Sequence, residues 1–132
     1  MRWLALVVPI LLAGCAANGD SPSGAKNPKQ LAEIADALKG LTPGKPVSCI
    51  DQTRIRDVKK FEGTILYQYS PRLIYRNDVS GGCTGLRYGD PIVSKTYSSQ
   101  LCRGDIIHTF SPGTPNISSG SCGLGSFVPY TR

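Results

Sequence analysis

Four cysteines are spread over residues 47–132, a stretch too short to bury a large hydrophobic core. Their even number, in a chain whose first residues form an export signal, predicts two disulfides. Zinc ligation is the competing interpretation, but no Cys-x2-Cys pair is present and His108 is the only histidine. We therefore expect a disulfide-stapled domain with no metal and no cofactor. The four residues are Cys49, Cys83, Cys102 and Cys122.

Four cysteines can pair in three ways, and the sequence alone leaves all three open. Two glycine-rich segments, residues 80–89 and 118–126, each contain one cysteine. Residues 111–126 show no clear secondary structure, and a disulfide is one way to order so long a segment. We favour the pairs Cys83–Cys122 and Cys49–Cys102.

The N-terminus has the parts of an export signal. Arg2 precedes an apolar run that starts at Trp3, and Leu12-Ala13-Gly14 stands directly before a fifth cysteine, Cys15. The run is far shorter than the roughly 20 residues that a membrane-spanning helix needs, and Pro9 interrupts it. A permanent transmembrane helix is therefore not expected here.

The order Leu-Ala-Gly-Cys at residues 12–15 resembles the lipobox of bacterial lipoproteins. In that family a diacylglycerol alkylates the cysteine, the signal is cut before it, and the new amino terminus is usually acylated. Each buried methylene contributes roughly 0.8 kcal/mol, so two or three chains make a stable anchor. The resemblance implies a leader over residues 1–14 and lipidation of Cys15. Ala16 replaces the Asp that retains enteric lipoproteins in the inner membrane, which favours the periplasmic side of the outer membrane.

The chain is basic, with 15 Lys and Arg against 9 Asp and Glu. Removal of Arg2 with the leader leaves 14 basic residues and a net charge of about +5. In an exported protein this charge does not indicate nucleic acid. It serves solubility, or it attracts an anionic envelope polymer or another envelope protein.

Composition divides the mature chain into three parts. Residues 15–27 are poor in large apolar side chains and predict a flexible tether. Residues 28–46 predict a helix and a Pro/Gly connector, since Asn27 can cap the helix, Pro28 suits its first position and Gly40 its exit. We expect the helix over residues 28–39 to pack on the domain through an apolar stripe of Leu31, Ile34, Ala35 and Leu38.

Residues 47–132 predict a small antiparallel β domain, a sandwich or barrel-like fold. In residues 64–69, Ile65 shares one strand face with two tyrosines. The next strand begins near residue 72, and Pro71 should occupy the first central position of the turn between them. Further strands are expected at residues 91–97 and 105–110, and around Phe127, where Pro129 should end the strand or confine it to an edge. In residues 49–63 the apolar side chains follow neither a helical nor a strand spacing, so we expect a strand plus an irregular turn there.

Few residues indicate chemistry. Three tyrosines and two arginines on the first two predicted strands could form a patch for a ligand, although such side chains also stabilise neighbouring strands. They are Tyr67, Tyr69, Tyr75, Arg72 and Arg76. His108 shares a strand face with Ile106 and Phe110, and no motif supplies it with a nucleophile or an orienting acid. No catalytic residue is assigned.

The segments GTILYQYS, RLIYRN, GGCTGL, QLCRGDII and SCGLGSFVPY occur in this order. Their order resembles a family of small exported proteobacterial proteins of unknown function, over roughly residues 47–132. The resemblance implies a shared disulfide-stapled β fold and no activity. We expect a membrane-anchored envelope lipoprotein with a binding or structural role rather than an enzyme. The alternative is a periplasmic hydrolase inhibitor or a small enzyme.

Overall fold

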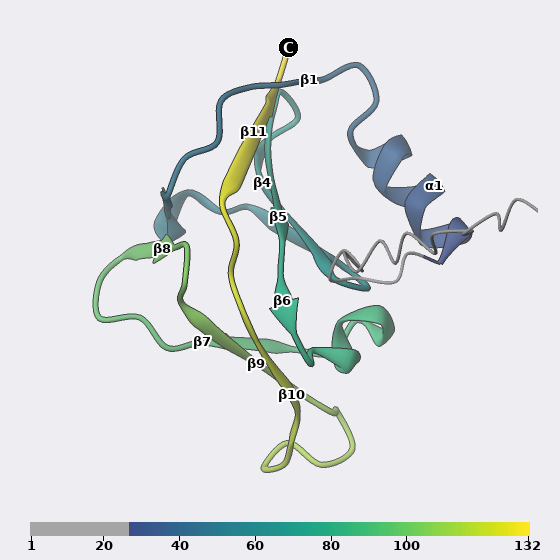
Figure 1. The fold of residues 1–132 in the computed structure, drawn as a ribbon, viewed down its shortest axis with the longest axis vertical. Helices are drawn as coiled ribbons and strands as arrows, with labels where there is room; N and C mark the ends of the chain where they lie inside the picture. Colours follow the sequence, from purple (N-terminus) through teal and green to yellow (C-terminus); the bar gives the residue numbers. More distant parts are fainter. Residues whose placement is uncertain (1–26) are drawn as a thin grey trace, which may run out of the picture.

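The computed structural model describes residues 27–132, which form one helix, two larger antiparallel sheets and a two-stranded sheet (Figure 1). The domain is mainly β, as predicted. The predicted leader, the predicted lipidation site at Cys15 and the predicted tether up to residue 26 lie outside the described residues.

The first sheet has five strands, and its order places the C-terminal strand second from one edge. In spatial order the strands are β1 (Thr42–Pro43), β11 (Phe127–Thr131), β5 (Leu73–Asp78), β4 (Thr64–Ser70) and β3 (Asp57–Phe61). The β4–β5 turn places Ser70 opposite Leu73, so Pro71 occupies the first central position as predicted.

The second sheet has four strands, and a two-stranded sheet lies beside it. In spatial order its strands are β6 (Ser80–Gly81), β10 (Ser118–Gly123), β9 (Ile106–Phe110) and β7 (Ile92–Ser94). The small sheet pairs β2 (Cys49–Asp51) with β8 (Gln100–Cys102), and two 3-10 helices complete the domain, η1 (Gln52–Arg54) and η2 (Thr84–Tyr88).

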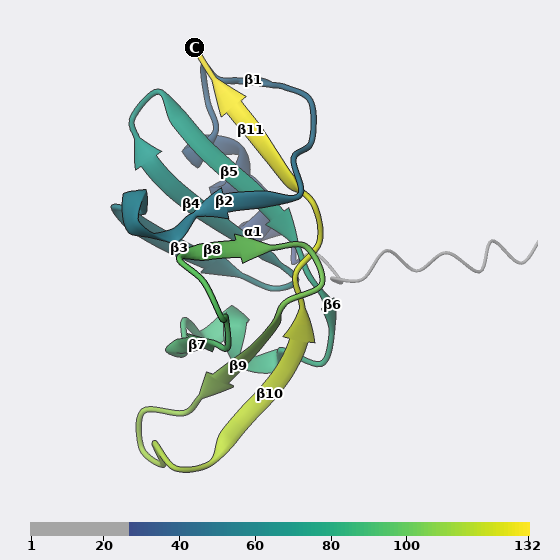
Figure 2. The ribbon, with the colours of Figure 1, turned by 90° about the vertical axis from the view of Figure 1, so that its left-hand side faces the viewer.

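Two strands continue from the first sheet into the second. Only Val79 separates β5 from β6, and residues 124–126 separate β10 from β11. β5 pairs with β11, and β6 pairs with β10. The β5–β6 segment and the β10–β11 segment are therefore two long antiparallel strands that bend at a common corner. Figure 2 shows β10 and β11 following one another through this bend. The corner closes one side of the sandwich, whereas β3 and β7 are terminal strands of their sheets.

Both faces of β4 are buried. Ile65, Tyr67 and Tyr69 contribute to the core between the sheets, and this alternation was predicted. Leu66 points to the opposite face and joins a second core beneath helix α1 (Pro28–Ala37). The five-stranded sheet is therefore the middle layer between the helix and the second sheet.

Helix α1 begins as predicted but contacts the sheet through a different stripe. The Asn27 side chain accepts a hydrogen bond of 2.9 Å from the Lys29 amide, and Gly40 has a φ of 78° beyond the helix end. Ile34 and Leu38 are buried as expected, with Ala37 packed beside them. Leu31 and Ala35 are exposed, so their predicted burial is wrong. The apolar contacts of the helix with the sheet therefore lie in its C-terminal half, whereas Gln30 in the first half accepts a hydrogen bond of 2.7 Å from the Glu62 amide.

Four predictions of local structure need correction. The glycine-rich segment 118–126 contains a strand, β10, that pairs on both sides. The expected strand at residues 91–97 is shortened to β7. The connector at residues 41–46 includes β1, which pairs with β11. Pro129 lies within β11 without ending it, because its carbonyl accepts from the Gly44 amide at 2.7 Å and its nitrogen thus faces away from β5.

Both favoured disulfides are present. Cys49 lies directly opposite Cys102 in the two-stranded sheet, so that bond staples β2 to β8. The Cys83–Cys122 bond ties the loop between β6 and η2 to β10. Each bond shortens the loops that the unfolded chain can explore, which contributes roughly 2–4 kcal/mol to the stability of the domain.

The closed corner is held by a buried asparagine. The Asn77 amide donates to the Gly125 carbonyl at 2.8 Å, and its carbonyl oxygen accepts from the Gly125 amide at 2.8 Å. Asn77 is fully buried, and a Cβ added to Gly125 would collide with the Asp78 carbonyl oxygen. The two bent strands can approach so closely only with glycine at this position.

We predict that Asn77→Ala lowers the free energy of unfolding by about 2–3 kcal/mol, because it leaves the amide and the carbonyl of the partly buried Gly125 without their side-chain partners. Asn116→Ala makes the same chemical change at an exposed loop position and should alter stability by less than about 0.5 kcal/mol. Urea unfolding of both variants checks this, and equal effects would contradict the role of the corner.

Candidate cleft between the sheets

A cleft of about 350 Å³ lies between the terminal strands β3 and β7, on the side that the bent strands leave open. Its walls come from both larger sheets, from η1 and from β8, and most of the lining side chains are apolar. The lining residues are Gln52, Ile55, Val58, Lys60, Tyr67, Ile92, Ser94 and Leu101. A volume of this size falls within the usual range for small-molecule sites.

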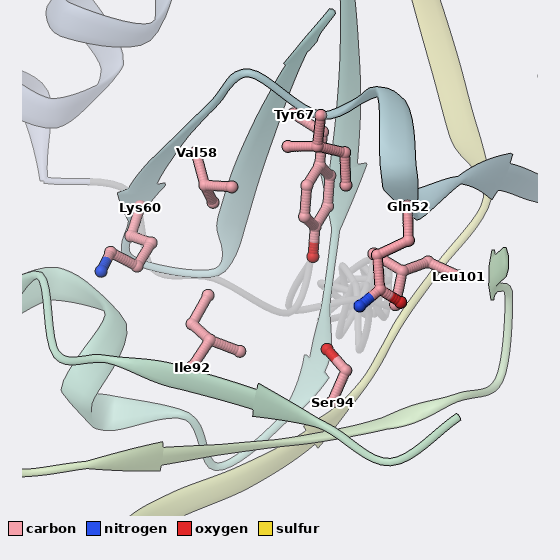
Figure 3. A pocket seen from close by; sticks show the side chains of 8 residues that line it. Gln52, Val58, Lys60, Tyr67, Ile92, Ser94 and Leu101 are labelled. Carbon is pink, nitrogen blue, oxygen red and sulfur yellow. The ribbon is translucent and has the colours of Figure 1, made fainter. Parts of the chain in front are cut away.

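Tyr67 is the central polar residue of the cleft. Its side chain is 3% exposed, and its ring packs against Phe127 with 5.9 Å between ring centroids. The hydroxyl is buried and has no hydrogen-bond partner among the described residues. Burial raises the pKa of this phenol, so it stays a neutral O–H donor across the physiological range. Figure 3 shows the hydroxyl pointing into the cleft, away from its own strand.

The first turn after β2 positions Gln52 on one wall. Asp51 caps η1 by accepting from the Thr53 amide at 2.9 Å and from the Thr53 hydroxyl at 2.6 Å, and these bonds lower the pKa of the Asp51 carboxyl. The Tyr69 hydroxyl donates to the Asp51 carbonyl at 2.6 Å, which fixes the turn to β4. The Gln52 amide group therefore projects into the cleft from an anchored backbone (Figure 3).

Strand β7 supplies the opposite wall. It pairs with β9 so that Val93 lies opposite His108, while Ser94 lies opposite the buried Ile107. Because strand side chains alternate, Val93 faces outward and Ile92 and Ser94 face the cleft. Figure 3 shows the Ser94 hydroxyl directed toward the Tyr67 hydroxyl across the space.

Lys60 is the one charged side chain that lines the cleft. It lies on the inner face of β3 with Val58, opposite Ile65 in the strand register. Its amino group extends away from Tyr67, on the far side of Val58 and Ile92 (Figure 3). The cleft thus has neutral hydrogen-bonding groups at one end and a cation at the other.

The predicted tyrosine–arginine patch is divided by the sheet. Tyr69 and Tyr75 contact edge to face with centroids 5.0 Å apart, on the inner face with Tyr67. Arg76 follows Tyr75 on β5 and therefore projects from the opposite face, where it pairs with Asp78 at 3.2 Å. Arg72 is exposed in the turn after β4. The cation that covers Tyr69 is instead Arg54, 4.9 Å from the ring centroid.

His108 lies on the outer face of the second sheet and does not line the cleft. Its Nδ1 is 3.1 Å from the Ser121 hydroxyl on β10, a cross-strand pair. Asp90 lies elsewhere, in a buried cluster where the Ser119 hydroxyl contacts its carboxylate and the Thr109 hydroxyl, each at 2.9 Å. This cluster fixes the loop after η2 to strands β9 and β10.

Sequence reasoning found Tyr67 but missed the other polar residues of the cleft. Gln52, Lys60 and Ser94 come from separate segments that no motif connects. The side chain of Lys60 points inward because β3 pairs with β4. The apolar residues of 49–63 follow no regular spacing, so the sequence did not reveal this pairing. Only the tertiary arrangement brings these side chains together.

No protein-family model, curated protein or solved structure matches this chain. Within residues 27–132, no helix is long and apolar enough to span a bilayer. The same residues contain no group of three or more His, Cys, Asp or Glu side chains placed to hold a metal ion.

We predict opposite effects of one chemical change at two neighbouring tyrosines. Tyr67→Phe should raise the free energy of unfolding by about 1 kcal/mol, because it removes a buried hydroxyl that has no partner. Tyr69→Phe should lower it by about 1 kcal/mol, because the bond to the Asp51 carbonyl is lost. Denaturant unfolding in the absence of added small molecules measures both. Destabilisation by Tyr67→Phe would show that its hydroxyl is satisfied.

Proposed function

We propose that this chain is an envelope lipoprotein whose domain is a non-catalytic binding module, with the cleft between the sheets as its ligand site. The observation that carries the proposal is the buried Tyr67 hydroxyl, which points into an apolar cleft without a partner. An unsatisfied buried polar group costs about 1–3 kcal/mol. Its retention in a small domain is explained if a ligand supplies the missing acceptor.

The cleft is suited to hold a ligand rather than to close. Its two walls belong to different sheets, which are joined covalently at the opposite, bent corner. The Cys49–Cys102 disulfide fixes β8, which carries Leu101 of the lining. Walls that are held in place lose little conformational entropy when a ligand enters, which favours binding, and only the side chains around the buried Tyr67 hydroxyl must shift to admit the acceptor.

The lipobox-like order at residues 12–15 and the two disulfides support a place in an oxidising envelope compartment. We propose that lipidated Cys15 attaches the protein to the outer membrane on its periplasmic side. The net positive charge of the chain then attracts an anionic envelope polymer or another envelope protein.

The anchor is tested by Cys15→Ser. We predict that the variant leaves the membrane fraction or stays unprocessed, while both disulfides form normally, because Cys15 takes part in neither. Ser21→Ala serves as the control and should remain in the membrane. Cell fractionation and mass spectrometry of the N-terminal peptide provide the readout. An unlipidated Cys15, or a mature N-terminus at another residue, would refute the anchor.

The ligand site is tested by fragment mapping. The methyl-labelled wild-type protein is placed in phosphatidylcholine nanodiscs and mixed with cationic, anionic and neutral small-molecule fragments, and the NMR shifts of its methyl groups are recorded. Methyl shifts should concentrate on the lining residues Ile55, Val58 and Ile92. Ser94→Leu, which fills the cleft, should abolish them. Shifts that persist in Ser94→Leu, or that fall mainly elsewhere, would place binding outside the cleft.

A further inference from the structure

From the arrangement of polar groups in the cleft, we infer that its occupant is a small neutral molecule with an apolar body and an oxygen acceptor, a carbonyl or a hydroxyl. The acceptor meets the Tyr67 hydroxyl. This inference rests on the proposed function and specifies the class of ligand that the site selects.

The neutral character of the ligand follows from the groups near Tyr67. The polar side chains that share this end of the cleft are the Gln52 amide and the Ser94 hydroxyl, and neither carries charge (Figure 3). A carboxylate or an ammonium that met the buried Tyr67 hydroxyl would lose part of its hydration without gaining an opposite charge, which is costly. A carbonyl or hydroxyl oxygen loses far less and gains the O–H donor.

The apolar body follows from the rest of the lining. Ile55, Val58, Ile92 and Leu101 form most of the remaining surface. A closed cavity of about 150 Å³ lined by such residues binds benzene. The cleft, at about 350 Å³, has room for a body roughly twice as large, such as an eight-carbon chain or two small rings.

Lys60 supplies the alternative that the experiment must separate. Its ammonium lies at the other end of the cleft, where it could attract an acid whose tail enters between the sheets. Such an acid would leave the Tyr67 hydroxyl unsatisfied. The two ligand classes therefore depend on different residues, since the neutral ligand needs Tyr67 and the acid needs Lys60.

Three probes of similar length test the inference: 2-octanone, octanoate and octylamine. The wild-type protein, Tyr67→Phe and Lys60→Met are compared in identical phosphatidylcholine nanodiscs, so that partitioning of each probe into lipid cancels between variants. Dissociation constants come from titration of the cleft methyl groups. Tyr75→Phe is the matched control, because Tyr75 lies on the same sheet face but does not line the cleft.

We expect 2-octanone to bind at least tenfold more tightly than octanoate or octylamine. Tyr67→Phe should raise the dissociation constant of 2-octanone about tenfold, which corresponds to about 1.4 kcal/mol. Lys60→Met and Tyr75→Phe should leave this constant within twofold of the wild-type value. Tyr67→Phe should not weaken the binding of octanoate.

Three results would overturn the inference. If octanoate binds more tightly than 2-octanone and loses affinity in Lys60→Met but not in Tyr67→Phe, the ligand is an acid, and the cleft remains a binding site. If 2-octanone binds equally well to Tyr67→Phe, the hydroxyl does not recognise the ligand. If no probe shifts the cleft methyl groups, both the ligand class and the proposed site fail.

Discussion

The two hydrogen bonds between Asn77 and Gly125 hold the corner on which the architecture depends. They fix the point where β5 continues into β6 and β10 continues into β11, so that the two larger sheets share their strands on one side. With the sheets joined at this corner, β3 and β7 remain as edge strands on the side away from it, while the other two edge strands, β1 and β6, lie beside the bent strands. The same constraint that closes the domain therefore also leaves the space in which the cleft lies.

Terminal strands carry a risk, because their unpaired backbone groups can recruit other chains. The domain limits this risk in two ways. β7 is only three residues long, and β3 directs Lys60 inward, a charged side chain that opposes the docking of another strand. Lys60 thus has a structural reason to occupy its position, independent of any ligand. Tyr67 has no equivalent reason, because a phenylalanine would fill the same space without burying an unpaired hydroxyl.

The sequence predicted those parts of the fold that local physics controls. The capped helix start, the alternation along β4 and the position of Pro71 follow from neighbouring residues. Strand β10 was missed because serine and glycine rarely form strands, yet a Cβ on Gly120 would collide with the Gly82 carbonyl oxygen. The segment between β6 and η2 passes so close to β10 that only small residues fit in this strand. No local sequence pattern reveals this close approach.

The cleft was predictable only in part for the same reason. Tyr67 belongs to a regular strand, and its inward direction follows from the strand period. The strand period does not show that Tyr67 lines a cleft. That depends on the residues across from it, Ser94 on β7 and Gln52 on η1. These lining residues stand about 15 to 40 positions apart in the chain, and a single sequence carries no signal that they share a cleft.

The central claim is that the Tyr67 hydroxyl is kept for a ligand, and a high-resolution crystal structure of the protein grown with 2-octanone tests it most directly. We predict density for the ketone between the sheets, with its oxygen about 2.7–2.8 Å from the Tyr67 hydroxyl. A cleft closed by a direct hydrogen bond between Tyr67 and Ser94, with no ketone bound, would contradict the account.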